Sequence, residues 1–403
     1  MRQALFVLNA GSSSIKFALY DLDLVLLCRG EIEEIGGARM TTSGPFADAL
    51  NAFGPPPQVT DRDTINAWLV GTLHQLPDID LCAAGHRIVH GGQKFSGPVA
   101  IDAQVLSDLR ALIPLAPDHQ PHNLAMVEAV AEQWPDLLQI ACFDTAFHRT
   151  QPRLAEIFPL PRALTDGGIL RYGFHGLSYE YIASVLPHYL NADERKRVIV
   201  AHLGNGASLC ALEDGKSVAT TMGFTTLDGL MMGSRSGAID PGVVLHLIRE
   251  KKMSPDDVAD LLNKNSGLLG VSGLSSDMRT LEASNDPHAQ EARALFAYRA
   301  VRETGSLIAA LRGLDAFVFT AGIGEHSTLT RQTICEGLAW AGLFLDEDRN
   351  KASETVISTA GSKIKVLVIP TNEEMAIAAG TRQLTAARPK PVSHHSKFSS
   401  EGP

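Results

Sequence analysis

The sequence predicts an α/β fold with mixed sheets, organised as two duplicated halves that face each other across a cleft. Strand-like apolar runs alternate with helical patterns from one end of the chain to the other. Two segments, 9–21 and 204–214, share one plan, in which a small-residue turn and a hydroxyl-bearing residue precede an alternating strand and an acid. The chain has 403 residues, 45% of them hydrophobic, which is enough for two separate cores.

The first expected element is a hairpin near the N-terminus. The apolar run 5–9 breaks on small residues and resumes over 15–20, where it alternates around Lys16. Small residues let a backbone approach another group closely and supply N–H and O–H donors, so the turn suits a phosphate. An ordinary hairpin with a serine turn explains this stretch, taken alone, equally well. A Walker loop is excluded, because the second Gly and the Gly-Lys-Ser/Thr ending are missing.

The later elements follow from apolar runs bounded by Gly or Asn, which predict strands, and from longer periodic stretches, which predict helices. The last helix is expected to begin after Thr371 or Asn372, because either side chain can cap it. In chain order we expect a strand at 81–92, helices at 122–133 and 178–190, a strand–turn–strand unit at 197–214, a strand with a glycine turn and a helix start at 317–327, and a strand leading into a helix at 365–384.

The composition argues against several classes of protein. A formal net charge of −10 disfavours a nucleic-acid partner, which requires a basic face. No apolar run approaches the length that spans a bilayer, so no membrane partner is expected. The tail 388–403, rich in Ser and Pro, is expected to be disordered. The cysteines lie far apart without a C-x-x-C pair, which indicates neither a zinc site nor a disulfide framework and favours a cytoplasmic location.

Two phosphate turns in facing halves would hold a nucleoside polyphosphate from both sides. A third element, "TAGIGEHS" (320–327), places Gly322 and Gly324 after a strand, where a flat ring or a ribose could lie close to the backbone. G-x-G after a strand is a weak signal by itself, but its position after two such hairpins strengthens it. A dinucleotide-binding turn is disfavoured, because the segment comes late in the chain and has no proper final Gly.

A series of short motifs carries the strongest functional signal: "NAGSSSIKF", "GHRIVHGG", "FDTAFH", "RYGFHGLSYEYI", "HLGNGAS", "MGFTTLDGLMMGSRSG", "AGIGEHS" and "PTNEEMAIA". Together and in this order they resemble the acetokinase family, within the superfamily of acetate and sugar kinases, actin and chaperone ATPases. The resemblance extends from Leu5 to about Leu384. It implies two duplicated ribonuclease-H-like domains with a nucleotide cleft between them. One domain is expected to combine the N-terminal segment 1–147 with the C-terminal segment 371–403. The other, the nucleotide-binding domain, is expected to comprise 148–370.

The resemblance also implies ATP or ADP as co-substrate and Mg²⁺, with Mn²⁺ as an alternative. The metal is expected between Asn9 and Glu373, with Glu374 as the other candidate, since Mg²⁺ takes hard oxygen ligands and few protein groups. Taken alone, "NEE" indicates helix capping, and "SSDMR" (275–279) indicates a polar cap. The implied ATP contacts are Lys16, His202, Leu203, Gly204, Asn205, Gly206, Asp277, Met278, Arg279, Gly322, Ile323, Gly324, Glu325 and His326.

On the acceptor side, the resemblance implies that Arg87 binds the carboxylate of the substrate. Asp144, His175 and Arg235 are the implied catalytic residues. Taken singly, such residues are as typical of a surface ion pair, a core histidine or a capping aspartate. The implied reaction is reversible transfer of the ATP γ-phosphoryl group to acetate, giving acetyl phosphate and ADP. The alternative is a propionate or butyrate kinase of the same family, and a homodimer is expected in either case.

The chain departs from the family pattern where the alkyl end of the acid should lie. Asp118 stands where the family has Leu, and Thr226 where it has Pro. A buried unpaired carboxylate is costly, so we expect Asp118 to turn toward solvent or toward His119 or His122. The missing proline ring at Thr226 should leave room for a slightly longer acid.

Overall fold

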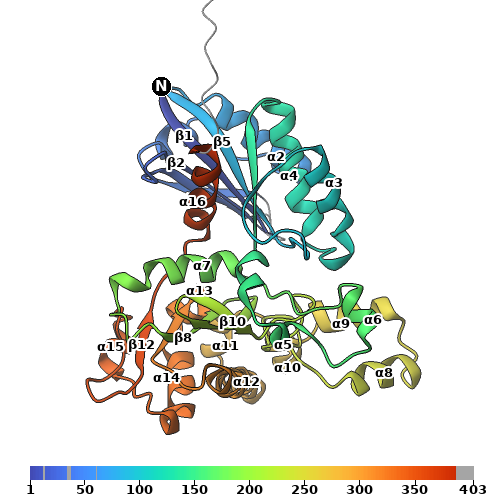
Figure 1. The fold of residues 1–403 in the computed structure, drawn as a ribbon, viewed down its shortest axis with the longest axis vertical. Coiled ribbons are helices and arrows are strands. Elements are labelled where there is room, and N and C mark those ends of the chain that lie inside the picture. Colours follow the sequence, from blue (N-terminus) through green and yellow to red (C-terminus); the bar gives the residue numbers. More distant parts are fainter. Residues whose placement is uncertain (12–13, 34–37, 60, 387–403) are drawn as a thin grey trace, which may run out of the picture.

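The structure, a computed structural model, describes residues 1–11, 14–33, 38–59 and 61–386, which form two lobes (Figure 1). Each lobe is built around one mixed sheet flanked by helices. Ser12 and Ser13 of the expected phosphate turn, and the tail 388–403, lie outside the described residues. Among the described residues, no helix combines the length and the apolar character that crossing a membrane requires.

The upper lobe contains a seven-stranded sheet in the order β4-β3-β2-β1-β5-β7-β6. Strand β1 pairs antiparallel with β2 and parallel with β5, and β5 pairs parallel with β7. Helix α16 packs on one face of this sheet, and α2 and α4 cover the other. The elements are β1 (Arg2–Ala10), β2 (Ser14–Asp21), β3 (Leu26–Glu33), β4 (Arg39–Ser43), α1 (Ala47–Asn51), α2 (Arg62–His74), β5 (Ile79–Ile88), β6 (Val99–Ala100), α3 (Ala103–Ala111), α4 (Gln120–Gln133), β7 (Leu138–Phe143) and α16 (Glu373–Ala386).

The lower lobe contains a five-stranded sheet in the order β10-β9-β8-β11-β12. The long helix α12 packs on one face, and α7 packs on the other. The elements are α5 (Arg153–Glu156), α6 (Arg162–Asp166), α7 (Gly176–Val185), β8 (Arg197–Leu203), β9 (Ala207–Glu213), β10 (Lys216–Thr220), α8 (Pro241–Arg249), α9 (Pro255–Lys264), α10 (Gly267–Ser272), α11 (Met278–Glu282), α12 (Pro287–Leu311), β11 (Ala316–Thr320), α13 (Ala321–His326), α14 (Thr328–Gly337), α15 (Glu347–Lys351) and β12 (Lys365–Val368).

The two sheets contain the same pattern of strand pairings, which confirms the predicted duplication. In the upper sheet the run β3-β2-β1-β5-β7 has two antiparallel pairings followed by two parallel ones. The run β10-β9-β8-β11-β12 repeats this pattern in the lower sheet. The predicted α/β fold with ribonuclease-H-like halves is therefore confirmed, and the two similar hairpins of the sequence are β1–β2 and β8–β9.

Several local boundaries differ from those expected. No glycine turn follows β11, because α13 begins directly at Ala321, so Gly322 and Gly324 lie inside a helix. The strand expected at 81–92 ends at Ile88, and the helix expected at 178–190 ends at Val185, two residues before Pro187. Of the two candidate caps of α16, Asn372 is the one whose side chain accepts a hydrogen bond, from the Met375 amide.

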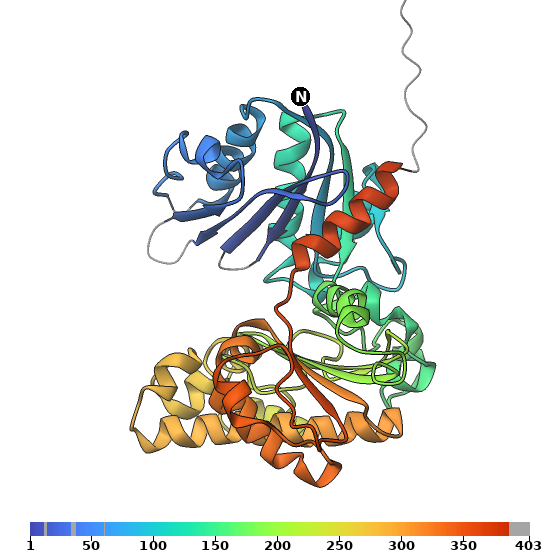
Figure 2. The same cartoon turned by 90° about the vertical axis from the view of Figure 1, so that its left-hand side faces the viewer.

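Helices α7 and α16 connect the two lobes. Helix α16 packs against β1, β5 and β7, while α7 contacts both α16 and β8. Figure 2 shows α7 end-on between the lobes, directly below the start of α16. The helix α16 lies close to the sheet because Gly85 has no side chain, and a Cβ there would meet Thr381 Oγ1 at 2.0 Å. The N-termini of both helices therefore lie at the junction of the lobes.

Candidate active site

The upper half of the site lies at the carboxyl ends of three neighbouring strands. Asn9 is near the end of β1, Arg87 near the end of β5, and Asp144 directly after β7. Because these strands are parallel neighbours, their ends meet at one edge of the sheet, where ligands of α/β proteins usually bind. The structure therefore brings together three predicted residues that are far apart in the sequence.

Arg87, which is mostly buried, forms an ion pair with the fully buried Asp144. The guanidinium donates to Asp144 Oδ2 from Nε at 3.1 Å and from Nη2 at 2.6 Å. Asp144 is only 1% exposed, and its Oδ1 atom has no hydrogen-bond partner among the described residues. Burial raises the pKa of Asp144, and the charge of Arg87 opposes this shift. The fork of Arg87 is thus shared with an internal carboxylate, which the sequence did not indicate.

The predicted metal pair, Asn9 and Glu373, is in contact at the start of α16. Asn9 Nδ2 donates to Glu373 Oε2 at 3.0 Å and to Glu374 Oε1 at 3.1 Å, while Asn9 Oδ1 accepts from Arg87 at 3.3 Å. Burial acts to raise the pKa of Glu373, but Arg87, His202, Lys16 and the hydrogen bond from Asn9 together hold that pKa below its ordinary value. Burial and the neighbouring Glu373 raise the pKa of Glu374.

This donor set fits a magnesium ion. Glu373 and Glu374 offer hard carboxylate oxygens, and the Asn9 amide would add its oxygen if it turned to present Oδ1 in place of Nδ2. The described residues contain no group of three or more His, Cys, Asp or Glu side chains that could hold a metal by themselves. Mg²⁺ usually binds to one or two carboxylates and completes its shell with phosphate and water, so a sparse protein set is what it needs.

The lower half of the site contains two stacked histidines. His175 precedes α7 with a left-handed backbone, φ 58°, and its ring lies on that of His202 at a centroid distance of 4.1 Å. His202 is near the end of β8, so it lies in a strand and not in the turn expected there. Burial, the neighbouring His202 and the charges of Arg87 and Arg235 keep the pKa of His175 well below its ordinary value. Burial likewise lowers the pKa of His202 to about 4.

Arg235 approaches His175 across Gly206. Its Nη1 donates to the Thr226 carbonyl at 3.1 Å, and its Nη2 lies 3.5 Å from His119 Nε2. A Cβ on Gly206 would lie 3.2 Å from His175 Nε2 and 3.9 Å from Arg235 Nη1. The β8–β9 turn, His175 and Arg235 therefore converge on one point.

Most of the predicted ATP residues line one cavity of about 680 Å³ in the lower lobe, which Glu31 of β3 also reaches. Leu203 does not line it, because its side chain is fully buried in the core of the lower lobe. Glu325 points elsewhere, and its carboxylate accepts from the Thr371 amide at 3.1 Å. Asp277 caps α11 and pairs with Arg279 at 2.7 Å, so the polar cap is present together with the cavity. The predicted residues on the wall are Gly204, Asn205, Asp277, Met278, Arg279, Gly322, Ile323 and His326.

Three more predicted ATP residues, Gly324, Lys16 and Gly206, lie off this wall, and Gly324 is buried within α13. Lys16 lies on β2 opposite Asn9 and is half-exposed, with Glu31 4.0 Å away. Gly206 is not on the wall of the 680 Å³ cavity but at the point where His175 and Arg235 approach each other. Lys16 and Gly206 therefore lie toward the junction of the lobes.

A second cavity, of about 640 Å³, adjoins the first. Arg235 and Thr226 line it from the lower lobe, and the segment 114–119 with His122 lines it from the upper lobe. Asp118 is exposed, as expected, but it also lies on the wall of this cavity. Asn205 lines both cavities, so one residue of the β8–β9 turn connects them.

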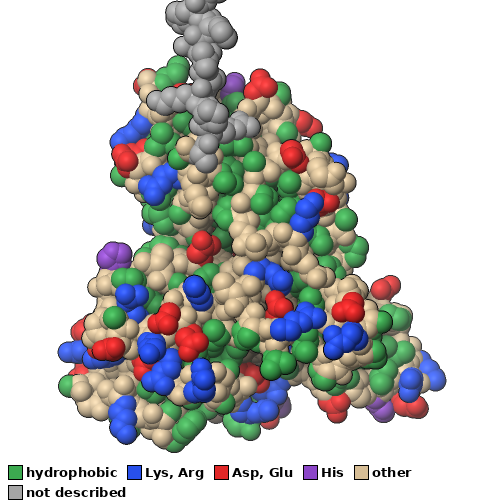
Figure 3. Space-filling view, viewed as in Figure 1, with side chains coloured by type: hydrophobic (Ala, Val, Ile, Leu, Met, Phe, Trp, Pro, Cys, Tyr) green, Lys and Arg blue, Asp and Glu red, His purple; other side chains and the backbone are tan. Residues whose placement is uncertain are grey.

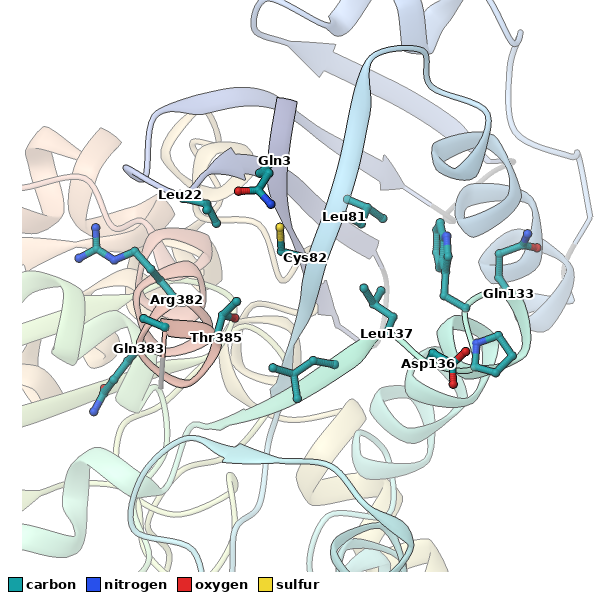
Figure 4. A pocket seen from close by; sticks show the side chains of 14 residues that line it. Gln3, Leu22, Leu81, Cys82, Gln133, Asp136, Leu137, Arg382, Gln383 and Thr385 are labelled. Atoms are coloured by element: carbon teal, nitrogen blue, oxygen red, sulfur yellow. The ribbon is translucent and has the colours of Figure 1, made fainter. Parts of the chain in front are cut away.

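Other surface features lie apart from this site. A cavity of about 950 Å³ opens at the edge of the upper sheet, between Leu81, Trp134 and Arg382 (Figure 4), and none of the predicted site residues lines it. On the face shown in Figure 3, basic and acidic side chains are interspersed over the lower lobe.

The sequence interpretation missed the hydroxyl groups behind His175. Ser208 Oγ lies 2.8 Å from His175 Nδ1 and 2.5 Å from the Tyr179 hydroxyl. A signal was present, since Tyr179 follows His175 by four residues at the start of a helix, which places both on one face. His119 was missed as a neighbour of Arg235, and only the approach of the two lobes brings them together.

The chain is similar to known proteins over almost its whole length. Residues 4–379 match the model of the acetokinase family. The acetate kinase of Rhodopseudomonas palustris (strain TIE-1) is 52% identical over 393 residues, covering 94% of this chain and 97% of that protein. The crystal structure of Porphyromonas gingivalis acetate kinase gives a TM-score of 0.81 at 34% identity, covering 95% and 99% of the two chains. The crystal structure of a propionate kinase from Francisella tularensis subsp. tularensis SCHU S4 gives a TM-score of 0.81 at 36% identity, covering 94% of this chain and 99% of that one.

Because Asp144 is buried with Arg87 as its counter-charge, replacing only one residue of this ion pair should destabilise the fold. Arg87→Met leaves the Asp144 carboxylate without its counter-charge, so we expect the free energy of unfolding to fall by about 3 kcal/mol at neutral pH. Arg87→Met/Asp144→Leu should recover most of this loss. Arg110→Met, at a more exposed ion pair, should change the value by less than about 1 kcal/mol. Urea unfolding followed by circular dichroism gives these values.

The same variant should respond to pH. Without Arg87 the pKa of Asp144 rises further, so the folded state gains stability relative to the unfolded state as pH falls through that raised value. The deficit of Arg87→Met should therefore shrink on acidification. A deficit that stays constant between neutral and acidic pH would contradict this electrostatic explanation.

Proposed function

The chain belongs to the acetokinase family, and from this membership we infer that it transfers the γ-phosphoryl group of ATP to acetate, giving acetyl phosphate and ADP, and that the reaction is reversible. It is an ATP-dependent phosphotransferase. The observation that best supports the inference within the fold is the position of Asn205, which lines both the cavity of the predicted ATP residues and the cavity of Arg235. A phosphoryl group passing between two substrates needs such a shared boundary.

Acetate is proposed to bind through Arg87, whose planar fork suits a carboxylate. In the structure this fork faces Asp144, so the substrate carboxylate would share or compete for the same donors. A simple carboxylic acid has a pKa near 4 to 5, as side-chain carboxyls do, and is ionised at neutral pH. Asp144 therefore has no substrate proton to remove in the direction of acetyl phosphate formation, and its proposed role is to orient Arg87 and the acceptor.

Arg235 and His175 are proposed to stabilise the phosphoryl group in transit. Both side chains approach Gly206 in the β8–β9 turn, His175 from the residue before α7 and Arg235 from the loop between β10 and α8. Phosphoryl transfer depends on positioning and on stabilising charge on the equatorial oxygens, so a cationic donor and a neutral donor at one point suit it. The low pKa of His175 means that it would act as a neutral hydrogen-bond donor.

Asn9 and Glu373 are proposed to hold Mg²⁺, and Asp144 lies near them through the neighbour Arg87, which contacts both Asn9 and Asp144. When bound, the ion would neutralise charge on the β- and γ-phosphates. Glu373 is favoured over Glu374 as ligand, because its pKa is lowered while that of Glu374 is raised. Lys16, half-exposed on β2 opposite Asn9, is proposed to meet the phosphates from the upper lobe.

We also propose the division into domains and the setting of the enzyme. One domain would comprise 1–147 with 371–403, because β1, β5 and β7 share their core with α16, and the nucleotide-binding domain would comprise 148–370. A homodimer and a cytoplasmic location are proposed from family membership. The acidic composition disfavours a nucleic-acid partner but is compatible with a local basic pocket that binds a small anionic substrate.

The choice of acid is tested by trapping acyl phosphate with hydroxylamine in the presence of ATP, Mg²⁺ and acetate, propionate or butyrate. We expect the highest kcat/KM for acetate, with appreciable use of propionate because Thr226 lacks the proline ring. Asp118→Leu should change KM for acetate only slightly, since Asp118 is exposed. A higher kcat/KM for propionate would favour the alternative propionate kinase, and no acyl phosphate with any acid would refute the proposed function.

Arg235→Ala should act mainly on kcat. Its proposed contact with the phosphoryl group is strongest in the transition state, so we expect kcat to fall by about 100-fold with little change in KM for ATP. Arg249→Ala, on the exposed end of α8, serves as the matched control and should behave as wild type. A loss confined to KM for ATP would place Arg235 in the nucleotide site instead.

Glu373→Gln should raise the Mg²⁺ concentration that gives half-maximal activity. The amide keeps the shape of the side chain but removes the negative charge, which weakens a hard cation most. Glu374→Gln is the matched control, one residue along the same helical turn, and should shift the Mg²⁺ titration less. The reverse order would assign the metal to Glu374.

A further inference from the structure

We propose that Tyr179 and Ser208 are positioning residues that keep the proton of His175 on Nε2, so that this nitrogen donates a hydrogen bond to the phosphoryl group in transit. The proposal rests on the proposed function and adds two residues to it. Tyr179 lies in α7 and Ser208 in β9, and both are fully buried. Neither reaches the cavities, so both would act through His175.

The three side chains form a short chain of hydrogen bonds. Ser208 Oγ lies 2.8 Å from His175 Nδ1 and 2.5 Å from the Tyr179 hydroxyl oxygen. The positions are fixed by regular structure, because His175 and Tyr179 are four residues apart at the start of α7 and Ser208 pairs with His202 across two strands. His202 stacks on His175, which holds the ring in this orientation.

The direction of the chain follows from where its hydrogens can go. If Tyr179 donates to Ser208 and Ser208 donates to Nδ1, every hydroxyl hydrogen has an acceptor. In the reverse direction the Tyr179 hydrogen would be left without an acceptor in the described part of the protein. If both Tyr179 and Nδ1–H donated to Ser208, the serine hydrogen would be stranded instead. A buried donor without a partner is unfavourable, so the first arrangement is favoured and Nδ1 is the acceptor.

The position of the single proton matters because His175 is neutral. Its pKa is well below the ordinary value, because it is buried and because His202, Arg87, Arg235 and His148 face it and would repel a second proton. A neutral imidazole has one N–H donor and one bare nitrogen. Burial also raises the pKa of Tyr179, so its hydroxyl keeps the hydrogen that it donates.

This arrangement protonates Nε2, which is the nitrogen that faces Gly206 and the guanidinium of Arg235. A Cβ on Gly206 would lie 3.2 Å from Nε2, and none of the described residues forms a hydrogen bond with Nε2. A protonated Nε2 attracts a phosphoryl oxygen, whereas a bare Nε2 would present a lone pair and repel it. The buried hydroxyls thus determine the sign of this contact.

The kinetic test uses Tyr179→Phe, which removes the donor and keeps the ring. We expect kcat for acetyl phosphate formation to fall roughly tenfold, less than the ~100-fold expected for His175→Ala, with both KM values nearly unchanged. Tyr181→Phe is the control, since it makes the same change on the same helix, where the described residues form no chain of hydroxyl groups with Tyr181. On a His175→Ala background Tyr179→Phe should have no further effect. An equal loss on both backgrounds, or no loss in wild type, would overturn the proposal.

The tautomer can be read directly with ¹⁵N-labelled histidine and long-range ¹H–¹⁵N correlation, with the His175 signals assigned by their loss in His175→Ala. We expect Nε2–H in wild type and a measurable Nδ1–H population in Ser208→Ala and Tyr179→Phe. Nδ1–H in the wild-type protein would overturn the proposal. This measurement needs no turnover, so it separates a failure of the hydroxyl chain from a failure of the proposed function, which would show as absence of acyl phosphate in wild type.

Discussion

The buried guanidinium of Arg87 is the charge on which the upper half of the site depends. It pairs with Asp144 and contacts Asn9, and its field reaches Glu373 and Glu374. Several acidic groups would otherwise be buried together at one sheet edge, where their mutual repulsion and loss of hydration are both unfavourable. One cation held in a strand therefore makes it possible to gather carboxylates where a metal and an acidic substrate are proposed to meet.

The lower half of the site, where the phosphoryl group is proposed to pass, combines neutral histidines with a permanent positive charge. Burial keeps His175 and His202 neutral, while Arg235 supplies permanent positive charge. Burial also lowers the pKa of Arg235, but a guanidinium stays charged throughout the physiological range. A site of fixed charges and neutral donors needs no rearrangement during transfer, which is the requirement for electrostatic stabilisation.

The duplication explains why the two halves are complementary. Each lobe contributes a hairpin at the same point of its sheet, β1–β2 above and β8–β9 below. The upper hairpin carries Asn9 and Lys16 as adjacent partners, whereas the lower one carries the Gly and Asn turn that separates the two cavities. The same hairpin thus presents polar side chains at the junction in the upper lobe and a turn of small residues, whose backbone another group can approach closely, in the lower lobe.

The sequence by itself determined the alternation of strands and helices, the duplicated hairpins and the family, because these depend on local periodicity and on motifs whose residues are adjacent. Through the family resemblance, the sequence also supplied most of the wall of the cavity that is proposed to bind ATP. The resemblance already paired Asn9 with Glu373, although 364 positions separate them. Only the tertiary structure decided that Arg87 pairs with Asp144, because this contact follows from the order of strands in the sheet. The contact of Ser208 with His175 was likewise beyond local patterns, since it depends on how β9 packs beside α7.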